Sequence, residues 1–126
     1  MALLLIVEDS WLSRRVLCKM LQEKGYETIE AASGPQALEM LPRISPDCIL
    51  LDLLMPEMEG REVLKILREQ GSKIPVIVIT ADIQKTTRCE CLELGAIAVI
   101  NKIPDSEELT RWVEKAISPQ HLEKQP

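Results

Sequence analysis

Five side chains that could hold a metal ion and a phosphate group lie at the ends of apolar runs in this sequence. Glu8 and Asp9 come directly after one run, and Asp52 comes after a second. Thr80 ends a third run, and Lys102 follows a fourth. Three carboxylates about 4 Å apart would repel one another by roughly 4 kcal/mol per pair at an effective dielectric constant near 20. Lys102 supplies one offsetting charge, and the all-oxygen ligand set selects a hard divalent cation such as Mg²⁺ for the rest.

An aspartate in such a site would act as a nucleophile without help from a histidine. The chain has one histidine, His121, in its polar C-terminal stretch, so a Ser–His or Cys–His dyad and a multi-His zinc site are excluded from its core. An aspartate is largely ionised at pH 7, because its reference pKa is near 3.9. Attack by this carboxylate on phosphorus would give an aspartyl phosphate. Lys102 and the metal would balance the charge of the phosphoryl oxygens, and Thr80 would donate a hydrogen bond.

Each of these residues also has a purely structural interpretation. An acid after a strand is often a helix N-cap, a threonine at a strand end follows from β-propensity, and a single lysine is usually a solvated charge. Their coincidence at one edge of a sheet favours a functional site.

The apolar pattern predicts the elements that bring these residues together. Short apolar runs, typical of strands buried on both faces, occupy 3–7, 48–51, 76–79 and 97–100, and 27–31 alternates as an edge strand does. Helical spacing follows the runs over 12–21, 37–41, 63–67, 83–94 and 109–117, with 83–94 the weakest. Gly25, Gly71 and Gly95 end helices, and Asp105 caps the last one. Alternating strands and helices predict an α/β fold with an open, doubly wound parallel sheet.

Composition excludes several other classes of protein. The chain has 126 residues, which favours one domain over 1–117 followed by a polar tail or linker over 118–126. A net charge of −5 and the scarcity of aromatic residues argue against direct nucleic-acid binding. No apolar run approaches the roughly 20 residues of a membrane span, and acids directly follow the apolar start, unlike in a signal peptide. Four cysteines without framework spacing favour the cytoplasm.

Four segments in order carry a family resemblance. Residues 7–10 (VEDS), 50–60 (LLDLLMPEMEG), 75–81 (PVIVITA) and 101–102 (NK) resemble the receiver domain of two-component response regulators, including the chemotaxis regulators. The resemblance covers about residues 3–117. It implies a flavodoxin-like (βα)5 fold with the strand order 2-1-3-4-5.

The resemblance also implies a phosphorelay function with assigned residues. Asp52 would take a phosphoryl group from a sensor histidine kinase or phosphotransfer protein, and Thr80 and Lys102 would contact that group. Mg²⁺ would be held by Glu8, Asp9, Asp52 and the backbone carbonyl of Leu54. Such a domain is a signalling switch that catalyses only its own phosphorylation and dephosphorylation. It would be cytoplasmic, and a monomer or a weak dimer.

The output of the switch would pass to a downstream protein or to an output domain outside this chain. In the family the usual output face consists of the helix predicted over 83–94, the strand over 97–100 and the last helix. Trp112, displaced from the apolar stripe of that last helix, is a candidate contact; simple packing is the alternative. Trp11 is a candidate lid or kinase contact, and a packed loop residue is the equal alternative.

The sequence departs from the family pattern at several positions near the site. Val99 stands where receivers usually carry Tyr or Phe, so the family's aromatic switch must be replaced by backbone and helix displacement. Ile103 stands where a proline usually follows the lysine, so a cis bond after Lys102 would be a non-proline one. Leu54 and Asp82 occupy positions that tune phosphate lifetime in the family, without a predictable direction here.

Two other classes of protein could carry a similar set of residues. A haloacid-dehalogenase-type hydrolase also uses Asp, Thr, Lys and Mg²⁺, but its nucleophile lies in an Asp-x-Asp motif after the first strand, and Asp52 is followed by Leu53 and Leu54. An interaction module that keeps the fold without phosphorylation is disfavoured, because all five site residues are present.

Overall fold

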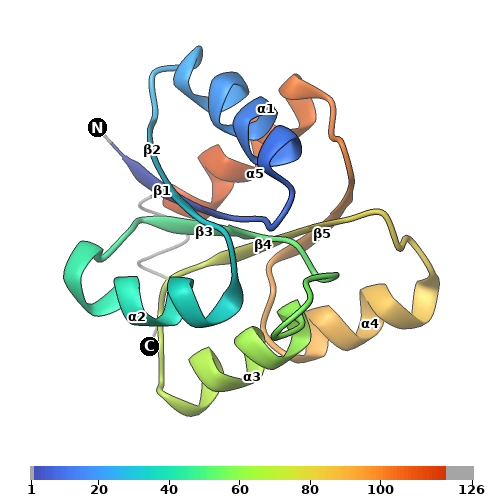
Figure 1. The fold of residues 1–126 in the computed structure, drawn as a ribbon. Coiled ribbons are helices and arrows are strands. Elements are labelled where there is room, and N and C mark those ends of the chain that lie inside the picture. The colour runs from blue at the N-terminus through green and yellow to red at the C-terminus, as the bar shows by residue number, and fades with distance from the viewer. Residues whose placement is uncertain (1, 119–126) are drawn as a thin grey trace.

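Five strands and five helices alternate along residues 2–118, the part of the chain that the computed structural model describes (Figure 1). The strands are β1 (Leu3–Val7), β2 (Glu27–Ala31), β3 (Cys48–Leu51), β4 (Val76–Thr80) and β5 (Ala98–Asn101). The helices are α1 (Trp11–Gln22), α2 (Gly34–Ile44), α3 (Gly60–Glu69), α4 (Lys85–Glu93) and α5 (Ser106–Ile117). Apart from Ser118, the predicted tail lies outside the described residues.

The strands form one parallel sheet in the order β2-β1-β3-β4-β5, which confirms the predicted 2-1-3-4-5 order. The register aligns the strand ends, since Val7 pairs with Leu51, and Thr80 pairs with Asn101. The residues that follow β1, β3, β4 and β5 therefore emerge at the same edge of the sheet.

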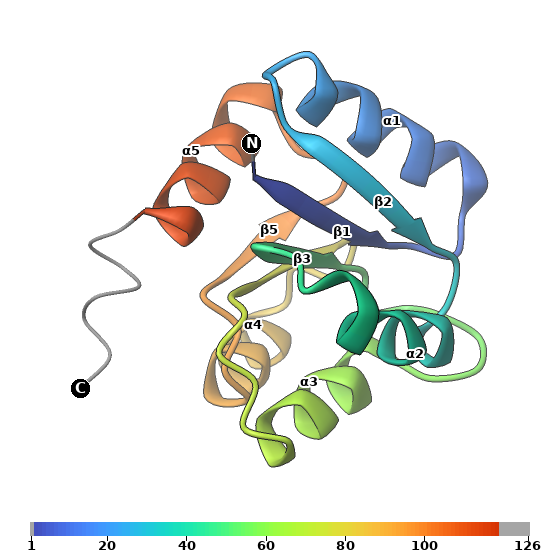
Figure 2. The same ribbon diagram turned by 90° about the vertical axis from the view of Figure 1, so that its left-hand side faces the viewer.

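Helices cover both faces of the sheet, with α1 and α5 on one face and α2, α3 and α4 on the other (Figures 1 and 2). Successive β1 side chains enter opposite cores, because side chains alternate along a strand. Leu4 and Ile6 belong to the core that contains α1 and α5 residues, whereas Leu5 and Val7 belong to the core under α2, α3 and α4. Burial on both faces explains why these strands are continuously apolar.

The residues predicted to end or begin helices do so in the structure. Gly25, Gly71 and Gly95 all have positive φ after helices, and the Asp105 carboxylate accepts a hydrogen bond from the Glu108 N–H at the start of α5. The predicted helix over 83–94 is shorter in the structure. Residues 83 and 84 stay outside it because the Asp82 carboxylate accepts the Gln84 N–H and holds this segment as a turn.

Thr80 ends β4, as predicted, whereas β5 differs from its predicted bounds because it is shifted one residue onward, to Ala98–Asn101. The parallel ladder continues through these residues because the Lys102 N–H donates to the Thr80 carbonyl at 3.0 Å. Among residues 2–118 the structure has no helix that is both long and apolar enough to span a membrane.

Candidate functional site

Three carboxylates meet at the carboxyl edge of the sheet. Glu8 and Asp9 follow β1, and Asp52 follows β3, the neighbouring strand. One oxygen from each carboxylate lies within 4.8 Å of the other two. Glu8 and Asp52 are buried, whereas Asp9 is exposed. The cluster is thus anchored inside the protein and open to solvent on the Asp9 side.

Hydrogen bonds around the start of α1 fix the position of Glu8. Its Oε2 accepts the backbone N–H of Ser10 at 2.9 Å, and its backbone carbonyl accepts a hydrogen bond from Arg14 Nη1 at 2.7 Å. Ser10 caps α1 by accepting the Ser13 N–H. Arg14 is itself held by Glu30 of β2, at 2.9 Å from Nε to Oε1. The acidic turn is therefore held by both α1 and β2.

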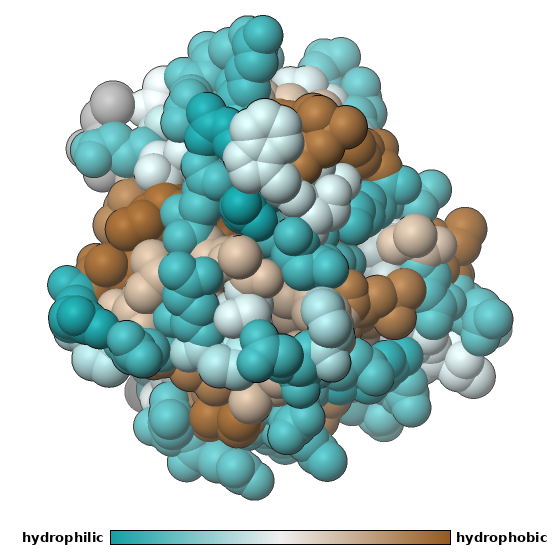
Figure 3. Space-filling model, in the orientation of Figure 1, coloured by the Kyte–Doolittle hydropathy of each residue, from teal (hydrophilic) through white to brown (hydrophobic). Residues whose placement is uncertain are grey.

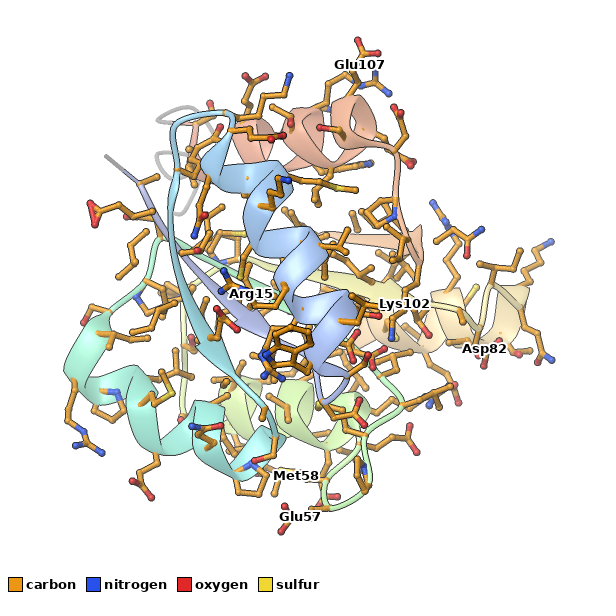
Figure 4. All side chains as sticks on the ribbon, turned by 45° about the horizontal axis from the view of Figure 1, so that its top comes forward. Arg15, Glu57, Met58, Asp82, Lys102 and Glu107 are labelled. Carbon is orange, nitrogen blue, oxygen red and sulfur yellow. The ribbon has the colours of Figure 1, made fainter. Side chains whose placement is uncertain are left out.

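Lys102 supplies positive charge to this cluster. Its Nζ lies 2.6 Å from Glu8 Oε1 and 3.5 Å from Asp52 Oδ2. Figure 4 shows Lys102 beside the N-terminal end of α1. Burial opposes its charge, but hydrogen bonding to Glu8 and the charge of Asp52 outweigh this effect and raise the pKa of Lys102. The Lys102–Ile103 peptide bond is cis.

Asp52 is the least satisfied carboxylate of the site. Burial, reinforced by the charge of Glu8, raises the pKa of Asp52 to about 6, although Lys102 partly opposes this shift. Asp52 Oδ2 is buried and has no hydrogen-bond partner among the described residues. An orphaned carboxylate oxygen beside two other carboxylates fits a hard cation, which binds through oxygen ligands.

Thr80 and Leu54 reach the same edge of the sheet by different routes. Thr80 is fully buried at the end of β4, where its Oγ1 accepts the Asp82 N–H at 3.1 Å. Its carbonyl accepts the Lys102 N–H, so the two predicted phosphoryl contacts are joined through the backbone. Leu54 lies two residues beyond Asp52 with an exposed side chain, and the role of its carbonyl as a metal ligand stays a prediction.

The structure also reveals side chains near the site that sequence reasoning did not single out for any role. Arg14 holds the Glu8 carbonyl, and a hydrogen-bond network that includes Thr87 and Arg61 reaches Asp82. The sequence carries no signal for these contacts, because they depend on how separate elements pack. Asp82, Thr87 and Arg61 belong to the β4–α4 loop, α4 and α3 respectively.

Comparison with known proteins agrees with this geometry. The family model described as the response regulator receiver domain matches residues 4–114. The chain is 37% identical over 122 residues to the regulatory protein AtoC of Escherichia coli, covering 97% of this chain but 26% of AtoC. It is also 37% identical over 112 residues to sporulation initiation phosphotransferase F of Bacillus subtilis, covering 89% of this chain and 90% of that protein.

Solved receiver structures share the fold. The receiver domain of the Francisella response regulator 1452 superimposes with a TM-score of 0.90 at 27% identity, covering 95% of this chain and 99% of the other. The Vibrio cholerae chemotaxis protein CheY4 superimposes with a TM-score of 0.85 at 30% identity, covering 92% and 98%. With the sheet order, the carboxylate cluster and the family match in agreement, the chain belongs to the family of response regulator receiver domains of two-component systems.

Proposed function

We propose that Asp52 accepts a phosphoryl group from a histidine of a sensor kinase or phosphotransfer protein, with Mg²⁺ held by Glu8, Asp9 and Asp52. The observation that carries the proposal is the buried Oδ2 of Asp52, which has no hydrogen-bond partner among the described residues and faces the Lys102 ammonium group at 3.5 Å and two further carboxylates. With a pKa of about 6, Asp52 is mostly ionised at pH 7 and is ready to act as a nucleophile.

Phosphoryl transfer then needs little proton chemistry from the protein. A carboxylate oxygen of Asp52 forms the new O–P bond while the N–P bond of the phosphohistidine breaks, and its electron pair stays on the imidazole nitrogen. Lys102 neutralises charge on the phosphoryl oxygens, and the Thr80 hydroxyl donates a hydrogen bond to one of them. When bound, Mg²⁺ supplies further positive charge against the equatorial oxygens. Turnover is limited to the protein's own phosphorylation and dephosphorylation.

The hydrogen bonds of Glu8 suggest how the three carboxylates share the metal. Both Glu8 oxygens already accept strong donors, Lys102 Nζ and the Ser10 N–H. Asp9 is exposed, and Asp52 Oδ2 has no hydrogen-bond partner among the described residues, only the ion pair with Lys102 at 3.5 Å. We therefore propose Asp9 and Asp52 as the stronger ligands, with Glu8 contributing charge and the Leu54 carbonyl completing the protein's share of the ligands.

Exposed apolar side chains near the site support an approach of the donor from this edge. Trp11 and Leu12 are each 66% exposed in the first turn of α1. Leu54, Ile83 and Ile103 are exposed in the loops that follow β3, β4 and β5. On the face shown in Figure 3 the apolar residues form separate patches among hydrophilic ones. Desolvated apolar and aromatic contacts dominate most interfaces, which favours Trp11 as a contact for the phosphodonor protein.

We also propose where the output partner binds and in which compartment the protein acts. Trp112 of α5 is half-buried against the core, and Lys115 Nζ lies 5.0 Å from its ring centre. It remains the candidate contact on the α4–β5–α5 face for a downstream protein or output domain, in a monomer or a weak dimer. All four cysteines are free thiols, and the cytoplasm remains the proposed compartment.

Phosphorylation by a small donor tests the proposal. We expect incubation with acetyl phosphate and Mg²⁺ to add the mass of one phosphoryl group to the intact protein. The addition should disappear in Asp52→Asn and on chelation of Mg²⁺. Glu57→Gln, which removes an exposed carboxylate from the loop after β3, is the matched control and should be modified like the wild type. An unchanged wild-type mass, also with a cognate kinase present, would contradict the proposal.

A further inference from the structure

A network of hydrogen bonds leads from Thr80, at the end of β4, to helix α3. Its members are Thr80 at the end of β4, Asp82 in the following loop, Thr87 in α4 and Arg61 in α3. Figure 4 shows Asp82 beside α4. The network therefore joins three successive elements, α3, β4 and α4, through their side chains and the loop after β4.

Thr87 is the centre of this network, and its hydrogen bonds have a defined direction. Its side chain is buried, at 3% exposure. Arg61 Nη2 donates to Thr87 Oγ1 at 3.2 Å, and Thr87 Oγ1 lies 2.8 Å from Asp82 Oδ2. Because a hydroxyl has one proton and an ionised carboxylate only accepts, the Thr87 hydroxyl donates its hydrogen bond to Asp82. This hydrogen bond, with that of the Gln84 N–H, lowers the pKa of Asp82 and keeps it an acceptor.

The backbone N–H of Asp82 links this hydrogen-bond network to the Thr80 hydroxyl. The Asp82 N–H donates to Thr80 Oγ1 at 3.1 Å, which occupies a lone pair of that hydroxyl. The Thr80 proton is then directed to another acceptor. A phosphoryl oxygen on Asp52 would be such an acceptor, so the network prepares Thr80 to donate.

The far end of the network is anchored on α3, close to the loop that carries Asp52. Arg61 forms ion pairs with Glu59, the N-cap residue of α3, and with Glu90 of α4, at 3.1 Å for the second. The Gly60 N–H donates to the Leu53 carbonyl at 2.9 Å, one residue beyond Asp52. The start of α3 is thus tied to the phosphoacceptor loop on one side and to Thr87 on the other.

We infer that Thr87 and Arg61 are positioning residues that act through Asp82 on Thr80 and couple phosphoryl binding to the α3–α4 junction. The inference rests on the proposed function of Asp52. Position 99 holds a buried valine in place of an aromatic residue. The hydrogen-bond network would give this protein a route for the signal that needs no aromatic ring. Coupling of this kind is reciprocal, so a bound phosphoryl group would also strengthen the α3–α4 network.

Affinity for a phosphoryl mimic tests the inference at Thr87. Beryllium trifluoride, a tetrahedral mimic, is titrated by calorimetry at saturating Mg²⁺. We expect its dissociation constant to rise about fivefold in Thr87→Val, the loss of one hydrogen bond, and to return to near the wild-type value in Thr87→Ser. Thr86→Val is the matched control, because Thr86 is the exposed neighbour on the same helix. The affinity for Mg²⁺ alone should stay unchanged in all three, which a general loss of structure would not allow.

A second set of variants tests the α3 end of the network, at Arg61. It also keeps the inference testable if Thr87→Val fails to fold. Arg61→Met should weaken binding of the mimic about threefold. Arg68→Met should not, although Arg68 also joins α3 to α4, through the Glu93 carbonyl at 2.7 Å. Equal effects of Arg61→Met and Arg68→Met, or unaltered binding in Thr87→Val, would overturn the inference alone. Failure of the wild type to bind the mimic would overturn the proposed function and the inference with it.

Discussion

At the scale of single residues, the environment of Asp52 disfavours the charged form of the carboxylate that its proposed function requires. Its carboxylate is 4% exposed and shares its surroundings with Glu8, so the charged form is disfavoured in the metal-free fold. The pKa of Asp52 is raised from 3.8 to about 6 on folding. A group with a raised folded pKa stabilises the fold fully below its unfolded pKa, and this contribution is lost as the pH rises through the folded value. Between about pH 4 and 6 the metal-free protein should therefore lose stability through Asp52.

Removing the charge of Asp52 should stabilise the protein where that charge is unfavourable. In chelator at pH 7.5, we expect Asp52→Asn to raise the free energy of unfolding by about 3 kcal/mol, which is the shift of the Asp52 pKa from 3.8 to about 6 converted at 1.36 kcal/mol per pKa unit. The gain should vanish near pH 4, where the wild-type carboxyl is protonated. Urea unfolding across this pH range measures it, with the exposed Glu57→Gln as control. A variant that is less stable than the wild type at pH 7.5 would contradict the assigned environment of Asp52.

At the scale of elements, the start of α3 is fitted closely to the end of β3. A Cβ at Gly60 would lie 2.5 Å from the Asp52 carbonyl oxygen and 2.9 Å from Leu53 Cα. Both are backbone atoms that cannot move without shifting the loop that carries Asp52. Gly34, the first residue of α2, instead faces side chains, with Val63 Cγ2 at 2.9 Å and Met58 Cβ at 3.2 Å.

This difference predicts unequal effects of the same substitution. Gly60→Ala should lower the free energy of unfolding by about 2–3 kcal/mol, the range of overpacking against fixed atoms, and should slow phosphorylation by acetyl phosphate. Gly34→Ala should cost less than half as much, because side chains can adjust. Urea unfolding and intact mass measure the two effects. Equal losses of stability, or normal phosphorylation of Gly60→Ala, would show that the α3–β3 contact does not position Asp52.

The elements themselves were predictable where one local signal dominated. Continuous apolar runs identified four strands, because burial on both faces leaves little room for polar residues. Residues 83 and 84 were wrongly included in a helix, since the turn made by the Asp82 carboxylate and the Gln84 N–H competes with helical hydrogen bonds. The single-residue shift of β5 likewise follows from backbone pairing with β4, which no local pattern encodes.

At the scale of the molecule, the sequence predicted which residues gather but not how they are held. The strand order follows from alternating strands and helices and the family pattern, and it places the ends of β1, β3, β4 and β5 at one edge. Contacts between distant elements could not be predicted from the sequence. Examples are the hydrogen bond from Arg14 to the Glu8 carbonyl and the hydrogen bond from Arg61 to the Thr87 hydroxyl. Such contacts depend on rotamers and packing that are settled only when the layers come together.

Chemical trapping of the phosphorylated residue tests the central claim most directly. The protein is phosphorylated with acetyl phosphate and Mg²⁺, reduced with borohydride, digested and sequenced by mass spectrometry. Reduction converts an aspartyl phosphate to homoserine, and we predict homoserine at position 52 alone, with none when Mg²⁺ is chelated. Homoserine at another acid, or a phosphorylated protein with an unaltered Asp52, would contradict the assignment of Asp52 as the phosphoacceptor.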